Sequence, residues 1–266
     1  MTSQDRMTAN LFFNAAFPVM RVVLEDDPAM KAKFKDVQGT VQICAKEGDE
    51  LMACHLVFDR GALTVNQGPA QKPDITLSFN SVVKMNTMFR GGKALPSIKG
   101  FSKLGLLIKV FSLLMSLMIM MPTSRPKDPV KQKLKVKMSL YMVTRALSTY
   151  NKLGNPEMAE WCRRQPDRIY QFIVDGDAKD GGKPEPAIAC YLRVKAGKSK
   201  SGHGVYTRRS PFVLFHFSSV SGAMKVLLKD VGFVEGVEQG CVEVVGSPEY
   251  AMALNDFMAV LQGMLT

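Results

Sequence analysis

The sequence predicts an α+β protein built from two copies of one unit. Its 266 residues, 46% of them hydrophobic, are enough for two domains with their own cores. Apolar residues recur at helical spacing in some segments and alternate in others, which predicts both helices and strands. The order of these segments in the first half, helix, strands, helix, strand, helix, returns in the second half.

The first half begins with a predicted helix. Apolar residues recur at helical spacing from Asn10 to Leu24, and we expect Pro18 to kink this helix or to mark its start. Asp27 followed by Pro28 predicts a second, short helix with an acidic cap.

Strands follow these helices. Four short runs of alternating or β-branched residues are expected as strands: 40–44, 52–58, 61–65 and 74–79. Ser81 predicts the N-cap of a helix that ends at Gly91 and Gly92, and residues 94–99 are expected to form a fifth strand.

A methionine-rich segment, "LGLLIKVFSLLMSLMIMMP", runs from Leu104 to Pro122, and Ser102 is its expected cap. A membrane span needs about 20 apolar residues, but Lys109 would lie well inside such a span. We therefore expect a buried helix. Two interpretations stay open: its methionines fill a core, or they line a cavity for a lipid.

The next stretch, "PTSRPKDPVKQKLKVK", contains three prolines and six basic residues. It predicts an exposed connection, residues 122–137, between a first domain at 1–121 and a second at 138–266. Four alternating lysines would lie on one face of this segment if it is extended: Lys131, Lys133, Lys135 and Lys137.

The second half repeats the first. "SPFVLFHFSSV" aligns with "KPDITLSFNSV" at a constant offset, so that Phe215 and Phe217 correspond to Leu77 and Phe79. "NPEMAEWCRRQPDRIYQFIVDG" aligns with "DDPAMKAKFKDVQGTVQICAKEG". After "SPFVLFHFSSV" we expect a helix, then a strand at 241–245 and a closing helix at 248–265.

These segments resemble the sterol carrier protein two family. The resemblance lies in "DDPAMKAKFKDVQGTVQICAKEGDELMACHLVFDRGALTVNQG", in "KPDITLSFNSVVKMNTMFRGGKALPSIKG" and in the apolar helix that follows. It covers about residues 10–120, and it reaches 140–266 through the repeat. It implies two sterol-carrier-like domains. Each would have a mostly antiparallel five-stranded sheet covered by helices, with an apolar cavity between sheet and helices for sterols, fatty acyl chains or similar lipids.

The expected ligand-lining residues are apolar side chains on the fourth strand of each copy and on the helices that follow. In the first copy they are Leu77, Phe79, Met85, Met88, Phe89, Leu107, Val110, Phe111, Leu114, Met115 and Met118. In the second copy they are Phe215, Phe217, Leu227, Met252, Leu254, Phe257, Met258 and Leu261.

Composition indicates which partners to expect, the state of the cysteines and the cellular location. A net charge of +11 favours contact with anionic partners, either nucleic acid or acidic lipid, although it also fits a merely lysine-rich soluble surface. We expect peripheral contact with an anionic membrane rather than nucleic acid binding, because the basic stretch from Tyr191 to Arg209 offers few aromatic residues on which bases could stack. The five cysteines are irregularly spaced and include no C-x-x-C pair, which predicts buried thiols rather than disulfides or zinc. No secretory signal is recognisable, so we expect a cytoplasmic location.

A basic segment, Tyr191 to Arg209, contains no acid and is expected to be a flexible hairpin loop, with phosphate head groups as one alternative partner. The histidines His55, His203 and His216 are far apart, and we expect His55 and His216 to be structural. No G-x-S-x-G elbow, Walker loop or complete dinucleotide motif occurs.

The sequence therefore predicts a non-enzymatic protein that binds, and transfers or presents, a lipid, without a cofactor or metal. The alternative is an interaction module whose apolar helices are buried against a partner or the other domain, without a ligand. An enzyme that uses the fold as a hydrophobic substrate pocket is a third class, for which the sequence shows no catalytic pair.

Overall fold

The structure, a computed structural model, describes residues 2–100, 103–176 and 185–266. The chain divides into two compact units: Met1–Met121 with Met264–Thr266, and Pro122–Gly263. Each unit has one five-stranded sheet and several helices, so the α+β class is confirmed. The cap expected at Ser102 lies outside the described residues.

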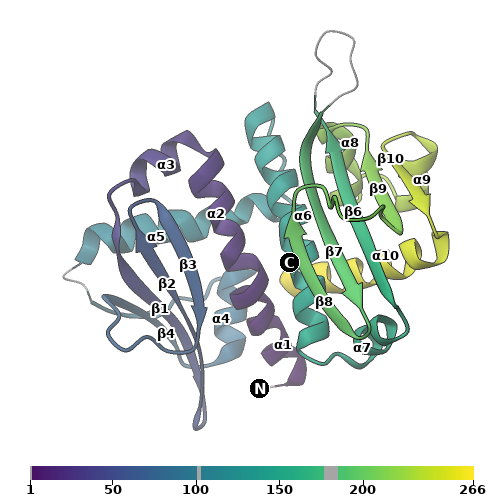
Figure 1. Cartoon of the computed structure of the whole chain (residues 1–266). Helices are drawn as coiled ribbons and strands as arrows, with labels where there is room; N and C mark the ends of the chain where they lie inside the picture. The colour runs from purple at the N-terminus through teal and green to yellow at the C-terminus, as the bar shows by residue number, and fades with distance from the viewer. Residues whose placement is uncertain (1, 101–102, 177–184) are drawn as a thin grey trace. The chain divides into compact units, whose positions relative to one another are not determined.

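The first unit carries its sheet in the order β3-β2-β1-β4-β5. Its strands are β1 (Gln38–Glu47), β2 (Glu50–Asp59), β3 (Ala62–Gln67), β4 (Ile75–Phe79) and β5 (Ser97–Lys99). Its helical segments are α1 (Ser3–Leu11), η1 (Phe12–Ala16), α2 (Phe17–Asp26), α3 (Pro28–Phe34), α4 (Val82–Phe89), α5 (Leu104–Ser116) and η3 (Leu117–Met120). Of these, α2 and α4 pack against the sheet (Figure 1).

The second unit carries its sheet in the order β10-β9-β6-β7-β8. Its strands are β6 (Asp167–Asp175), β7 (Pro186–Lys195), β8 (Lys198–His203), β9 (Val213–Phe217) and β10 (Val242–Gly246). Its helices are α6 (Pro129–Lys152), α7 (Pro156–Arg163), α8 (Val220–Leu227), α9 (Phe233–Glu238) and α10 (Pro248–Leu265). The long helix α6 packs along β7 and β8 and against α8 (Figure 1).

Both sheets are mixed rather than purely antiparallel. In the first unit β1 pairs in parallel with β4, and in the second β6 pairs in parallel with β9. The other strand pairs in each sheet are antiparallel. The parallel pair arises because the chain crosses the sheet after the third strand of each unit. The fourth strand then lies beside the first strand and runs in the same direction.

The predicted repeat is confirmed at the level of register. Val41 pairs with Ile75 in the first unit, and the aligned residues Tyr170 and Val213 pair in the second. The strands β4 and β9 show the same alternation, in which every second residue is buried. The two sheets therefore share one topology, although few residues are identical.

A buried glutamine fixes the crossover segment in each unit. Gln42 on β1 accepts a hydrogen bond through Oε1 from the Ala70 N–H at 2.8 Å. The aligned Gln171 on β6 accepts one from the Tyr206 N–H at 2.9 Å. Because a buried amide needs hydrogen-bond partners, each glutamine fixes the backbone that leads to the parallel strand.

The first helix is continuous across Pro18. Pro18 has no N–H to donate to the carbonyl four residues earlier, so the normal hydrogen-bond pattern fails there. The π-helix η1 lies immediately before it and closes with a bond from the Phe17 N–H to the Phe12 carbonyl. One wide turn accommodates the proline, so the helical path extends from Ser3 to Asp26.

The prediction that residues 122–137 form an exposed connection is wrong from Pro129 onward, where a helix begins. Asp128 accepts a hydrogen bond from the Lys131 N–H, and Pro129 occupies the first turn of α6. The alternating lysines that suggested an extended face are therefore on a helix, where Lys135 is 2% exposed. Asp128 and Pro129 form a helix start signal of the same kind as Asp27 and Pro28.

The basic segment is also more ordered than predicted. Residues 191–195 belong to β7 and 198–203 to β8, joined at a tight turn where Ala196 and Gly197 have positive φ angles of 45° and 82°. Two arginines of this segment, Arg193 and Arg209, form ion pairs with Asp167. The segment is thus a paired hairpin followed by a shorter connection, not a flexible loop.

Gly246 gives a test of the packing in the second sheet. Its φ is 112°, and a methyl group at this position would lie 2.1 Å from the Phe212 carbonyl oxygen. We expect Gly246→Ala to lower the free energy of unfolding by about 3 kcal/mol, measured by urea denaturation. Gly240→Ala is the control, because Gly240 has a φ of 67° and no atom within 4 Å of the added methyl group. Equal losses in the two variants would contradict this account.

Candidate functional site

The predicted lining residues of the first unit are mostly buried. Leu77 and Phe79 lie on the inner face of β4, and the α4 residues Met85, Met88 and Phe89 are buried as well. The Phe89 ring joins these elements, with its centroid 6.2 Å from that of Phe79 and 4.8 Å from that of Phe17 on α2. The structure therefore brings the expected residues of β4 and α4 together around one aromatic cluster.

The α5 residues of the predicted set form a second buried group. Leu107, Val110 and Leu114 are buried, and Phe111 and Met118 are half-buried. Helix α5 packs against α2 and α3. Met118, which follows α5, lies close to the end of α4. A methyl group built on Gly91, just after α4, would be 2.7 Å from Met118 Cε.

The outer face of α5 is apolar too. Leu104, Ile108 and Met115 are 55%, 58% and 52% exposed. The structure thus does not bring Met115 to the buried group, although the sequence placed it among the lining residues. Exposed large apolar side chains that recur along one helix face are typical of a surface that contacts another molecule.

In the second unit the predicted residues lie on β9, α8 and α10. Phe215, Phe217, Leu254 and Leu261 are buried. Leu227, Phe257 and Met258 are half-buried, and Met252 is 42% exposed. On β9, the Phe215 ring stacks on that of Phe172 on β6, with the two centroids 4.7 Å apart.

Sequence reasoning missed an aromatic cluster that extends this group. Trp161 on α7 has its ring centroid 5.7 Å from that of Phe257 on α10 and 5.2 Å from that of Tyr170 on β6. Tyr250, at the start of α10, lies 6.2 Å from Trp161. No pattern identified these residues, because they come from three separate elements and only the fold brings them together.

Arg168 lies inside this cluster. Its guanidinium carbon is 3.9 Å from the ring centroid of Phe212 and 4.3 Å from that of Tyr250. Burial, largest among several causes, raises the pKa of the neighbouring Tyr170, whose hydroxyl donates to Gln165 Oε1 at 2.5 Å. Tyr170 is therefore a neutral hydrogen-bonding group at ordinary pH.

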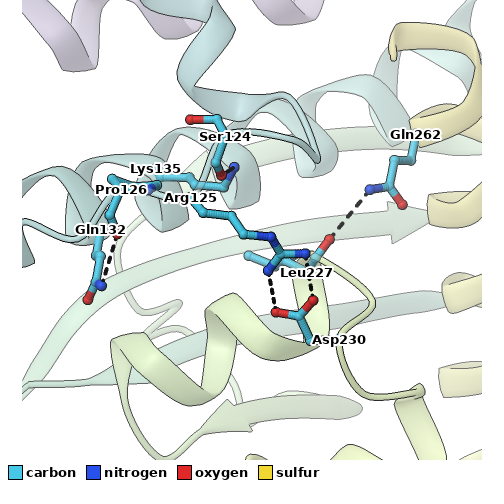
Figure 2. A network of polar contacts seen from close by, with 8 residues as sticks. All are labelled: Ser124, Arg125, Pro126, Gln132, Lys135, Leu227, Asp230 and Gln262. Atoms are coloured by element: carbon cyan, nitrogen blue, oxygen red, sulfur yellow. Dashed lines mark hydrogen bonds and ion pairs between the residues drawn. The ribbon is translucent and has the colours of Figure 1, made fainter.

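A polar network holds the segment before α6 to the second unit (Figure 2). The Arg125 guanidinium donates two hydrogen bonds to the Asp230 carboxylate, at 2.6 and 2.7 Å. Lys135 Nζ donates to the Ser124 carbonyl at 2.8 Å. Figure 2 also shows the Gln132 amide donating to the Pro126 carbonyl. The connection is thus fixed in place by its own side chains and by α6.

Burial lowers the pKa of Lys135 from its ordinary 10.5 to about 8, and the positive charge of Arg125 contributes less. The hydrogen bonds from Arg125 hold the pKa of Asp230 below its ordinary value. With a pKa of about 8, Lys135 is still charged at neutral pH. Burying this charge lowers the stability of the folded protein at that pH.

The titratable residues noted in the sequence have structural partners. His55 Nδ1 lies 3.0 Å from the Gly68 carbonyl, and the His203 ring stacks on Tyr141. His216 Nε2 lies 2.8 Å from Asp175 Oδ1, and its Nδ1 lies 3.8 Å from Glu243 Oε2.

All five cysteines are buried and free, as predicted: Cys44, Cys54, Cys162, Cys190 and Cys241. In the part of the chain that the structure describes, no group of three His, Cys, Asp or Glu residues is placed to hold a metal ion.

One helical stretch meets the length and composition of a membrane span. It covers Ser3–Asp26, with a mean hydropathy of 1.3 in its most apolar window, of which 78% is buried inside the structure. Core helices of soluble proteins also show this combination, so the stretch is weak evidence for a span. Leu104–Met120 is a shorter apolar helix.

Comparison with known proteins gave matches only among solved structures. No family model matches the chain, and no curated protein matches it. Two matching solved structures are those of the inverting sec-alkylsulfatase Pisa1 from Pseudomonas sp. and of a double mutant of that enzyme. Their TM-scores are 0.25 and 0.26, with 10% sequence identity, and each match covers 70% of this chain. The match spans 30% of the length of those structures.

This finding corrects one expectation. The sequence predicted a protein without enzymatic activity, whereas the two solved structures named above are those of an enzyme. At these TM-scores the likeness identifies neither a reaction nor a catalytic residue in this chain. The resemblance to the sterol carrier protein two family receives no support from these matches and stays a prediction.

Lys135 gives a prediction about pH. Between pH 8 and 10.5 the unfolded chain holds the Lys135 proton that the folded protein has lost, so this residue's contribution to stability rises with pH. We expect Lys135→Met to be more stable than the wild type at pH 7. This advantage should shrink by up to about 1.4 kcal/mol per pH unit above pH 8.

The measurement is urea unfolding of both proteins from pH 7 to pH 10. The difference between them is the readout, because burial raises the pKa of Cys162 and Cys190 to about 12 and destabilises both proteins alike at alkaline pH. Lys133→Met, at an exposed position of α6, should show a constant difference. The same flat profile for Lys135→Met would contradict this assignment.

Proposed function

We propose that each unit binds a lipid or similar apolar ligand between its sheet and its helices, and transfers or presents it. The observation that supports this most is the repeated inner face. Leu77 and Phe79 in one unit and Phe215 and Phe217 in the other lie on equivalent strands. The helix beside each strand carries methionine: Met85 and Met88 on α4, and Met224 on α8. Methionine side chains adapt to apolar shapes that vary, as the chains of different lipids do.

Binding would be driven by the removal of hydrocarbon from water, worth about 0.8 kcal/mol for each CH₂ group. A ligand of a dozen methylenes would therefore bind without a specific polar motif. We propose that α5 in the first unit and α10 in the second move to admit and release the ligand. In the first unit Met118 contributes to the cover, near Gly91 at the end of α4.

We also propose that the first unit loads its ligand at an anionic membrane. The outer face of α5 presents Leu104, Ile108 and Met115, and the half-buried Lys109 follows Ile108 in the sequence. An apolar helix face with basic flanks is typical of helices that lie in a membrane interface. Each lysine near an anionic leaflet adds about 1 kcal/mol to binding.

The same exposed face favours a second candidate function, that of an interaction module. In that case Leu104, Ile108 and Met115 would be buried against a partner protein, and neither unit would hold a ligand. The two functions make different demands on two methionines of one segment. A ligand would contact Met118, whereas a partner would contact Met115.

Ligand binding is tested with delipidated protein and a fluorescent fatty acid. We expect saturable binding of about two ligands per chain, and about one for Met118→Lys, because an ammonium group in the first unit's apolar site opposes binding there. Met115→Lys is the matched control and should bind as the wild type does. The absence of saturable binding by the wild type would refute the proposal and favour the interaction module.

Membrane contact is tested with vesicles that contain phosphatidylserine. Ile108→Glu should lower the fraction of bound protein at least about tenfold, since it removes an exposed apolar side chain that would enter the membrane and adds charge repulsion. Val83→Glu, on the 47% exposed Val83 of α4, makes the same change of charge elsewhere and should have little effect. Equal effects of the two variants, or equal binding to neutral vesicles, would argue against this membrane surface.

A further inference from the structure

The guanidinium of Arg168 in the second unit lies close to two aromatic rings. Phe212, just before β9, and Tyr250, in the first turn of α10, both lie within 4.3 Å of its guanidinium carbon, measured to their ring centroids. The two rings also contact each other, with centroids 5.3 Å apart. Aromatic rings this close to a guanidinium stabilise the cation by cation–π attraction.

One nitrogen of this guanidinium lacks an acceptor. The guanidinium interacts with the Tyr170 hydroxyl, but among the described residues Arg168 Nη1 is buried and makes no hydrogen bond. The acids nearby in the sequence bind other residues. Asp167 pairs with Arg193 and Arg209, and Glu160 pairs with Arg163 and Arg164. A buried N–H of a charged group is stabilised strongly by an anionic acceptor, and a carboxylate, sulfate or phosphate group matches the planar fork of an arginine.

The surroundings of Arg168 are apolar on the side of α10. Trp161 lies between Tyr250 and Phe257, with ring centroids 6.2 and 5.7 Å from theirs. Phe257 is one of the residues expected to line the ligand site. The cluster therefore connects a charged group at one end to the apolar side chains of α10 at the other.

We propose that Arg168, with Phe212 and Tyr250, binds the anionic head group of a single-chain amphiphile whose hydrocarbon chain lies along Trp161 and Phe257. This assignment rests on the proposed function of ligand binding and names the class of ligand for the second unit. A fatty acid is the simplest molecule of this class.

The first unit lacks this head-group site. In the shared register Gly39 corresponds to Arg168, and Asp74 corresponds to Phe212. Leu106 of α5 occupies the space next to Gly39, since a methyl group there would lie 2.7 Å from Leu106 Cδ2. The Asp74 carboxylate accepts a hydrogen bond from the Thr40 N–H and would repel an anion. The two units thus differ in head-group preference although they share a fold.

Trp161 is the single tryptophan of the chain, so its fluorescence reports on this site alone. The test titrates delipidated full-length protein with dodecanoate and with dodecan-1-ol, which has the same chain length and no charge. We expect dodecanoate to bind at least about tenfold more tightly. Arg168→Gln should lower the dodecanoate affinity to that of the alcohol and leave the alcohol's affinity unchanged.

Arg163→Gln is the matched control, because it removes one positive charge from exposed α7 and should preserve the preference for dodecanoate. Dodecyltrimethylammonium should bind the wild type most weakly of the three probes, which tests the assignment even if the Arg168 variant does not fold. Equal affinity of the wild type for acid and alcohol, or equal losses for both in Arg168→Gln, would overturn the head-group site and leave the proposed function standing. If no probe binds, both fail.

Discussion

The parallel pairing of the first and fourth strands of each unit is the constraint on which the rest of the structure depends. It places β1 and β6 in the centre of their sheets, with neighbours on both sides. The chain must then cross over before β4 and β9, and the buried amides of Gln42 and Gln171 hold the crossover segments in place. The fixed crossover in turn sets the position of β4 or β9, and so of its inner face. It also sets the position of the helix that follows, α4 or α8.

Much of the fold was predictable because its signals are local. Caps at Asp27 and Ser81 are read from single residues, and both accept the expected hydrogen bonds from the helices they precede. The alternation in β4 and β9 follows from the two-residue period of a strand. The errors came from patterns that fit two structures. Lysines at every second position from Lys131 to Lys137 suggested an extended segment, but the cap at Asp128 determined a helix.

The site was predictable only in part, for a different reason. Apolar residues on β4, α4, β9 and α10 could be selected because a core face has a sequence period. Arg168 and its aromatic neighbours have none, because Trp161, Phe212 and Tyr250 come from different elements. Nothing in the sequence around Arg168 indicates that one of its nitrogens is buried. Tertiary structure alone creates that environment, and the same holds for the lowered pKa of Lys135.

The shared register of the two sheets has a consequence for folding. Tandem units with one topology can exchange equivalent strands while the chain is still partly unfolded, and such misassembly is a characteristic failure of repeat proteins. A strand such as β9 would meet β1 with its backbone in register, so backbone pairing alone would not reject it. Side chains must do so. Asp74 and Phe212 occupy equivalent positions before β4 and β9, but their neighbours differ, since Asp74 lies beside Gly39 and Phe212 lies against the Arg168 guanidinium. Divergence between the copies at such positions would therefore disfavour mispairing while the chain folds.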